Sequence, residues 1–256
     1  MDQSGESNAL RKSSLARHRR HLSGIGLATA KRLSDEGAHI LITGHSEDHL
    51  AEARQALPNA TVIANDAADP DAAEALAEAV REFAPDGLDG AFLNAGFGRF
   101  AALDETDADD MDKHYAVDLR APLLQAKLLA DCLKDGGALL LISSGTVGGG
   151  RPDALVYSAM KAGIRQAVRS LASAFAPRGI RVNAVAPGAT ETRFHARGGM
   201  SDDEIREYHK KVAKMVPLGR FGKPEEAAAV ACFLLSDDAS YVTGSEYRVD
   251  GGISMA

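Results

Sequence analysis

Short apolar runs alternate with amphipathic stretches along the chain from residue 24 onward. The apolar runs predict strands at 39–43, 60–64, 90–93, 138–142, 180–185 and 245–249. The amphipathic stretches predict helices at 27–36, 47–56, 70–84, 107–134, 154–175, 202–214 and 224–235. Because parallel strands are joined by crossover helices, this alternation predicts an α/β fold, a doubly wound parallel sheet with helices on both faces. Such sheets bind ligands beyond the carboxyl ends of their strands, so we expect the functional site after residues 43, 64, 93, 142 and 186.

Composition and charge narrow the class of protein. The 256 residues have a net charge of −7 and no Trp, which argues against a nucleic-acid binder. No apolar run reaches the ~18 residues of a membrane span, and no signal-peptide core is visible, so we expect a cytoplasmic protein without a membrane partner. Cys132 and Cys232 fit neither a disulfide framework nor a metal-ligand spacing, and we expect no metal.

Three polar residues suggest acid–base chemistry. Tyr157 and Lys161 are four residues apart on a predicted helix, which puts both side chains on one face. Ser144 follows the buried strand at 138–142, at its carboxyl end. An ammonium beside a phenol favours the phenolate, so we expect Lys161 to lower the pKa of Tyr157. A phenol tuned in this way can exchange a proton with an alcohol oxygen, while a serine hydroxyl polarises it.

Several motifs, in this order and spacing, give the chain a family resemblance. They are Gly24-Ile25-Gly26, Asn94-Ala95-Gly96, Ser144, Tyr157-Ser158-Ala159-Met160-Lys161, Pro187-Gly188 with Thr192, and Val249-Asp250-Gly251-Gly252. Together they resemble the single-domain form of the short-chain dehydrogenase/reductase (SDR) family across residues 23–256. The resemblance implies a Rossmann-like sheet in a single dinucleotide-binding and catalytic domain.

The resemblance also implies an activity. It implies an NAD(P)-dependent oxidoreductase that transfers a hydride between a nicotinamide cofactor and a small-molecule carbonyl or alcohol substrate. Tyr157 is then the catalytic acid/base, Ser144 anchors the substrate oxygen, and Lys161 binds the nicotinamide ribose. It further implies a homotetramer or homodimer that packs through the helices at 107–134 and 154–175 and the last strand.

One catalytic position departs from the family pattern. The family has an Asn in the long helix after the fourth strand, and its backbone carbonyl holds a water that links the lysine to solvent. Asp118 occupies this position here. A backbone role survives the change to Asp, whereas the amide donor is lost and a carboxylate is added. Asp118 therefore remains a catalytic candidate.

The resemblance also assigns residues to the cofactor, and the second strand bears on its identity. The cofactor-binding candidates are Gly24, Ile25, Gly26, His45, Ser46, Asp66, Asn94, Ala95, Gly96, Tyr157, Lys161, Pro187, Gly188, Thr190 and Thr192. NAD enzymes place a carboxylate at the end of the second strand, on the ribose 2′-hydroxyl. Here the strand ends in Thr43-Gly44-His45-Ser46, without an acid, so NADP is favoured over NAD. Residues 148–151 and 189–215 are expected to shape the substrate pocket, but the substrate cannot be read from them.

The N-terminal segment, residues 1–22, is basic and atypical. The family begins with an apolar central strand followed by Thr-Gly-x-x-x-Gly-x-Gly, whose glycines approach the pyrophosphate. Counting back from Gly24 places that Thr at Arg19 and the first Gly at Arg20. Residues 16–22 read Ala-Arg-His-Arg-Arg-His-Leu, and cations buried without partners cost several kcal/mol each. We therefore expect the first strand, at about residues 10–22, to be distorted or missing.

A compensated frameshift would explain this segment. The bases GCTCGTCACCGGCGGCACCTC encode residues 16–22, and the same bases read from the second position encode Leu-Val-Thr-Gly-Gly-Thr-Ser, the family's strand end and glycine turn. Sequencing the coding DNA tests this hypothesis. A basic phosphate-binding segment, a targeting leader and a nucleic-acid arm are the competing interpretations. If the segment is made as written, an alternative function is open, in which a catalytically impaired relative serves as a binding or assembly protein.

Overall fold

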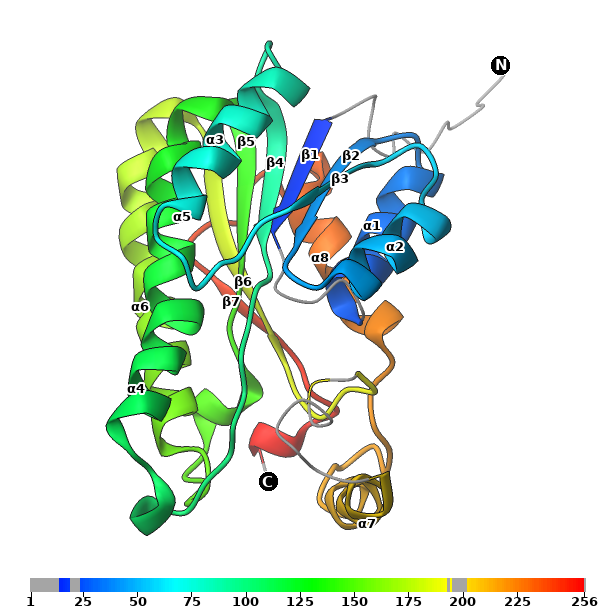
Figure 1. Ribbon diagram of the computed structural model, residues 1–256, viewed down its shortest axis with the longest axis vertical. Helices are drawn as coiled ribbons and strands as arrows, with labels where there is room; N and C mark the ends of the chain where they lie inside the picture. Colours follow the sequence, from blue (N-terminus) through cyan, green and yellow to red (C-terminus); the bar gives the residue numbers. More distant parts are fainter. Residues whose placement is uncertain (1–13, 19–23, 193, 195–201, 256) are drawn as a thin grey trace.

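A seven-stranded parallel sheet organises the molecule in the computed structural model, which describes residues 14–18, 24–192, 194 and 202–255 (Figure 1). The strand order is β3-β2-β1-β4-β5-β6-β7, and every neighbouring pair is parallel. The strands are β1 (Ser14–His18), β2 (His39–Gly44), β3 (Thr61–Ala64), β4 (Leu88–Leu93), β5 (Leu133–Ile142), β6 (Arg181–Pro187) and β7 (Glu246–Val249). The predicted doubly wound α/β fold is confirmed.

Helices cover both faces of the sheet, as right-handed crossovers require (Figure 1). One face carries α1 (Ile25–Asp35), α2 (Glu47–Ala56) and α8 (Pro224–Leu235). The other carries α3 (Ala72–Phe83), α4 (Ala108–His114), α5 (Ala121–Leu129) and α6 (Leu155–Phe175), and α7 (Asp202–Ala213) lies beyond one end of the sheet. Each face packs its own apolar core, and β2, β4, β5 and β6 between the two cores are mostly buried. These buried layers fix the strand ends that form the site.

The structure describes part of the segment in which we expected the first strand to be distorted or missing. The backbone of Ser14–His18 forms β1 between β2 and β4, with Ala16 in register with Leu41 and Ala91. Residues 10–13 and 19–22 lie outside the described residues, so the expectation of a distorted strand and turn stays a prediction. Main-chain hydrogen bonding does not depend on side-chain type, so two apolar neighbouring strands template a parallel strand here. The Arg19–Arg20 pair lies outside the described residues.

The long helix predicted at 107–134 is interrupted. It consists of α4, a π-helical turn η2 (Tyr115–Arg120) and α5, and a strand already begins at Leu133. Pro122 has no N–H to bond the Asp118 carbonyl, which weakens the α-helical ladder at this turn. Gly136 has a φ of +79°, which favours glycine and does not suit a helix, and Leu133 pairs with Leu88 instead.

None of the helices in the described ranges is long and apolar enough to cross a membrane.

Candidate active site

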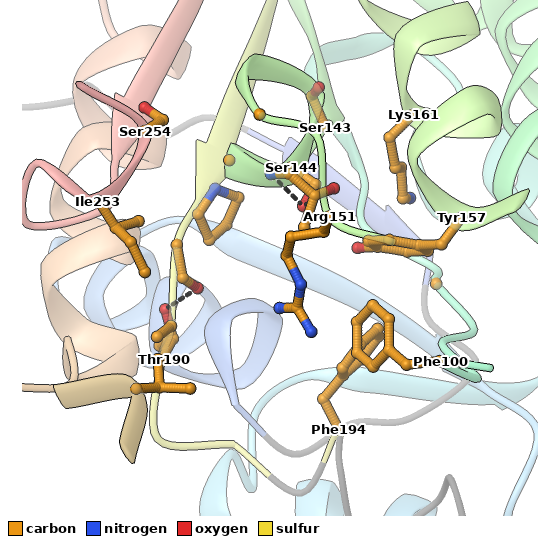
Figure 2. A pocket seen from close by; sticks show the side chains of 18 of the residues that line it. Phe100, Ser143, Ser144, Arg151, Tyr157, Lys161, Thr190, Phe194, Ile253 and Ser254 are labelled. Atoms are coloured by element: carbon orange, nitrogen blue, oxygen red, sulfur yellow. Dashed lines mark hydrogen bonds between the residues drawn. The ribbon is translucent and has the colours of Figure 1, made fainter. Parts of the chain in front are cut away.

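A cavity of about 370 Å³ opens beyond the carboxyl ends of the central strands (Figure 2). Most of the residues predicted for the site line it, namely Ile25, Asn94, Gly96, Ser144, Tyr157, Lys161, Pro187, Gly188, Thr190 and Thr192. The start of α1, the first two turns of α6, the end of β6 and the loops that follow β4, β5 and β6 supply these residues. The cavity therefore lies where a doubly wound sheet binds its ligands.

Tyr157 and Ser144 meet inside this cavity. Tyr157 lies in the first turn of α6 and is 8% exposed, while Ser144 follows β5 and is 6% exposed. The Ser144 hydroxyl accepts hydrogen bonds from the Thr146 backbone N–H at 3.2 Å and the Thr146 hydroxyl at 3.0 Å, and it also hydrogen-bonds with Tyr157. Two hydroxyls are thus held together at the cavity wall, with little of either side chain exposed.

Lys161 lies one turn further along α6, on the same face as Tyr157. Its Nζ is 5.7 Å from the centroid of the Tyr157 ring, and it donates to the Ile142 carbonyl at 3.3 Å. The same Nζ is 3.2 Å from Oδ1 of Asp118, and both side chains are almost completely buried. The structure therefore brings together all four residues that sequence analysis selected as catalytic candidates.

The pKa of Tyr157 differs from our expectation. Burial raises it above the ordinary value near 10, the charge of Asp118 raises it further, and the hydrogen bond with Ser144 lowers it. We expected Lys161 to lower this pKa. Instead, the Lys161 ammonium is paired with the Asp118 carboxylate. The negative charge of Asp118 offsets much of the effect that the ammonium would have on the pKa of Tyr157.

His114 extends the buried polar cluster on the far side of Asp118. Its Nδ1 is 2.8 Å from Oδ2 of Asp118, and its ring is 1% exposed. The ring also packs against Phe97 and Tyr157, with centroids 4.8 and 5.9 Å apart. We did not predict this residue from the sequence, although its position four residues before Asp118 on a helix was an available signal.

An aromatic and basic wall faces the other side of the Tyr157 ring (Figure 2). Phe100 lies edge-on to Tyr157 at 5.6 Å, and Phe194 lies 5.7 Å from it. The guanidinium of Arg151 stacks on Phe100 at 4.8 Å, and two hydrogen bonds join it to Asp153. Burial opposes the Arg151 charge, but hydrogen bonds with Asp153 and Tyr208 hold the pKa of Arg151 above its usual range.

Both expected substrate-shaping segments contribute to this cavity. They supply Gly149, Gly150, Arg151, Phe194, Tyr208, Val212 and Met215. Phe100 was not anticipated, because it lies in a loop of no regular pattern.

Glycines shape the backbone at the start of α1 and in the loop after β6. Gly24 caps α1 with a φ of +87°, and the first turn contains no acid, which suits an anion at the helix N-terminus. A Cβ on Gly188 would lie 2.5 Å from the Asp250 Cβ, so this loop passes the C-terminal segment with no room for a side chain. Thr190 follows and donates to the Gly188 carbonyl at 3.1 Å.

The remaining predicted residues lie outside the cavity wall. They are Gly24, Gly26, His45, Ser46, Asp66, Ala95 and Asp118. His45 and Asp66 come together at the ends of β2 and β3, where Nδ1 of His45 is 3.3 Å from a carboxylate oxygen of Asp66. An acid therefore does stand near the end of the second strand, although the second strand itself supplies none.

Comparisons with known proteins agree with this geometry. A family model described as enoyl-(acyl carrier protein) reductase matches residues 21–254. An uncharacterized oxidoreductase of Bacillus subtilis (strain 168) is 36% identical over 239 residues, covering 90% of this chain and 87% of its own length. Glucose 1-dehydrogenase of Gluconobacter oxydans (strain 621H) is 34% identical over 241 residues, covering 91% and 88%.

Solved structures have the same fold. A short-chain dehydrogenase/reductase from Serratia marcescens BCRC 10948 superposes with a TM-score of 0.83 at 29% identity, covering 95% of this chain and 98% of that one. The family match covers the candidate site and every strand of the sheet except β1. The chain belongs to the short-chain dehydrogenase/reductase family, oxidoreductases that act on CH–OH and C=O groups with a nicotinamide cofactor.

Proposed function

We propose that this protein catalyses reversible hydride transfer between NADP(H) and a carbonyl/alcohol pair, with Tyr157 as the acid/base. The observation that carries the proposal is the convergence of Tyr157, Ser144 and Lys161 on one cavity at the carboxyl edge of the sheet. In carbonyl reduction the Tyr157 hydroxyl donates a proton to the substrate oxygen, which Ser144 polarises. In alcohol oxidation the proton moves the other way.

The residues present fit a dinucleotide. The cavity runs from Ile25, at the start of α1, to Tyr157 and Lys161, and Asn94 and Gly96 form part of its wall. A Cβ on Gly96 would lie 3.8 Å from the Lys161 Nζ, so the glycine keeps the space beside the amine open. When bound, the nicotinamide supplies or accepts the hydride. Lys161 would hold its ribose, and the first turn of α1 would hold the pyrophosphate.

NADP is the proposed preference because β2 ends in Gly44-His45-Ser46 and offers donors to a 2′-phosphate. The Asp66 carboxylate beside His45 works against this preference and limits it. Replacing Ser46 with Asp puts a carboxylate at the end of β2 and keeps a residue that can cap α2. We expect kcat/KM for NADPH to fall by about tenfold or more relative to NADH, measured by steady-state kinetics. An unchanged ratio would place the 2′-phosphate elsewhere.

A matrix of both reduced cofactors against ketones and aldehydes tests the proposed function. We expect substrate-dependent loss of reduced-nicotinamide absorbance, and aromatic ketones are a natural first set because Phe100 and Phe194 flank Tyr157. The alternative, a non-catalytic binding or assembly protein, predicts no turnover. The family match begins at residue 21, so it does not include the arginine pair that stands in place of the family's Thr-Gly. Because this turn approaches the pyrophosphate, NADPH binding should be measured in the same experiment, by fluorescence titration. No binding at millimolar NADPH would favour the alternative.

A further inference from the structure

His114 faces a hydrogen-bond acceptor at each ring nitrogen. Its Nδ1 is 2.8 Å from Oδ2 of Asp118, and its Nε2 is 3.3 Å from the backbone carbonyl of Arg99. A neutral imidazole has one N–H and one lone pair. A lone pair on Nδ1 would point at a carboxylate, and a lone pair on Nε2 would point at a carbonyl. Only the doubly protonated ring satisfies both contacts.

Asp118 is held as a carboxylate in this cluster. Its Oδ1 accepts the Phe97 backbone N–H at 3.0 Å and lies 3.2 Å from the Lys161 ammonium. The carboxylate is completely buried, and burying a charge is costly unless it is paired and hydrogen-bonded. Oδ2 has no other partner among the contacts of the described residues than the His114 ring, so the donor on that side must come from His114.

The other charged groups around His114 are paired or acidic. Asp110 lies one turn earlier on the same helix and pairs with Arg99 from the loop before it. Asp153, from the loop before α6, lines the same small cavity as His114 and pairs with Arg151. Tyr157 contacts the ring from α6 as a neutral phenol. The carboxylates that surround His114 favour a positive charge on its ring.

We propose that His114 is protonated on both ring nitrogens and acts as a positioning residue. It holds the Asp118 carboxylate in place and offsets the negative charge that this carboxylate exerts on Tyr157. His114 and Lys161 are then positive and Asp118 is negative, so the cluster carries a net charge of +1. A positive charge nearby favours the phenolate form of Tyr157, which alcohol oxidation requires. The catalytic part of this inference rests on the proposed function of Tyr157.

The charge state is tested without any assay of activity. The full-length protein with ¹⁵N-labelled histidine is examined by NMR at about pH 7, where a histidine in water is mostly neutral. The His114 signals are assigned by their loss in His114→Gln. We expect both ring nitrogens of His114 to carry protons. One unprotonated nitrogen on His114 would overturn the proposal, whether or not the enzyme turns over.

The positioning role is tested by a double-mutant cycle. His114→Phe keeps a ring between Phe97 and Tyr157 but removes the donor and the positive charge beside Oδ2 of Asp118. We expect its pH profile for alcohol oxidation to move up by about one unit, which is about a tenfold loss of rate on the rising limb. Adding Asp118→Asn removes the negative charge that His114 no longer offsets and should recover most of that loss. His39→Gln is the matched control.

Failure of the double variant to recover activity would show that the loss in His114→Phe is one of packing, and would overturn the positioning role. If His114→Phe does not fold, His114→Gln takes its place in the cycle, since it supplies one neutral donor and should give a smaller shift in the same direction.

Discussion

The Tyr157 hydroxyl combines burial, a hydroxyl partner and a nearby negative charge. Burial and Asp118 raise its pKa, and Ser144 lowers it, with the net result above the ordinary value. A phenol with a raised pKa is protonated at neutral pH, so it is ready to donate a proton to a carbonyl oxygen. As a base it must first lose that proton, so the two directions of the reaction should depend on pH differently.

With saturating cofactor, we expect kcat for carbonyl reduction to stay level from about pH 6 to pH 9, because Tyr157 remains protonated throughout that range. For alcohol oxidation we expect kcat to rise by up to tenfold per pH unit over the upper part of the same range, because the phenolate population grows with pH. Initial rates in both directions across one set of buffers provide the measurement. A reduction rate that falls through neutral pH would mean that Tyr157 titrates there.

Sequence alone selected residues that the structure brings together, but it did not predict their electrostatics. Tyr157, Lys161 and Ser144 are recognisable because helical spacing and a strand end fix where they lie. The charge pairing of Lys161 with Asp118 depends on how η2 faces α6 across the fold. No local pattern encodes that contact, so the direction of the pKa shift at Tyr157 could not be predicted. The pairing of Asp118 with His114 is different, because the four-residue spacing along the helix was a signal in the sequence.

The elements of the sheet were largely predictable, and the exceptions have physical causes. Apolar runs such as 138–142 are buried on both faces, and only a strand of a parallel sheet fits them. The helix predicted at 107–134 is broken at Pro122 and ends before the Gly136-Gly137 pair. The apolar spacing continues through this stretch, so the spacing alone predicted one long helix. For β1 the side chains gave no strand pattern, and its backbone pairs with β2 and β4 because main-chain hydrogen bonds do not depend on side-chain type.

The sequence of β1, the central strand, leads to a prediction about stability and cofactor binding. Arg17 is in register with Ile42 and Phe92, and His18 with Leu93, at the middle of the sheet. Replacing Arg17 with Leu and His18 with Val should raise the free energy of unfolding by about 2 kcal/mol or more, measured by urea denaturation. Replacing residues 19–22 with Thr-Gly-Gly-Thr should instead tighten NADPH binding by about tenfold or more, measured by fluorescence titration. A variant pair in which neither quantity improves would refute the view that this segment is a damaged strand and turn.

For the whole molecule, exposed small and apolar residues on α6 suggest how copies of the chain associate. Ala172 is buried against the sheet, but Ala159 and Ala162 are exposed on the outer face of the same helix. Leu155 at the start of the helix and Leu123 on α5 are also exposed. Exposed apolar and small residues on adjacent helices suit helix packing between copies of a chain, and we propose a homodimer or homotetramer through this face.

Light scattering coupled to size-exclusion chromatography tests this assembly. We expect the unmodified protein to elute as a dimer or tetramer, and Ala159→Glu with Ala162→Glu to shift it to a smaller species, because four buried carboxylates per interface would lack partners. Ala51→Glu, on the exposed face of α2, is the matched control. An unmodified protein that is already a monomer would contradict the proposal.

Turnover by Tyr157→Phe, with the cofactor and carbonyl substrate that give the highest rate, tests most directly whether Tyr157 transfers the proton. The variant keeps the ring between Lys161 and Phe100 and removes only the hydroxyl. We predict a loss of kcat of about 10²-fold to 10⁴-fold with NADPH affinity nearly unchanged, while Tyr241→Phe, at a fully exposed tyrosine, keeps its rate. A Tyr157→Phe enzyme that turns over at close to the original rate would contradict the assignment of the proton to this phenol.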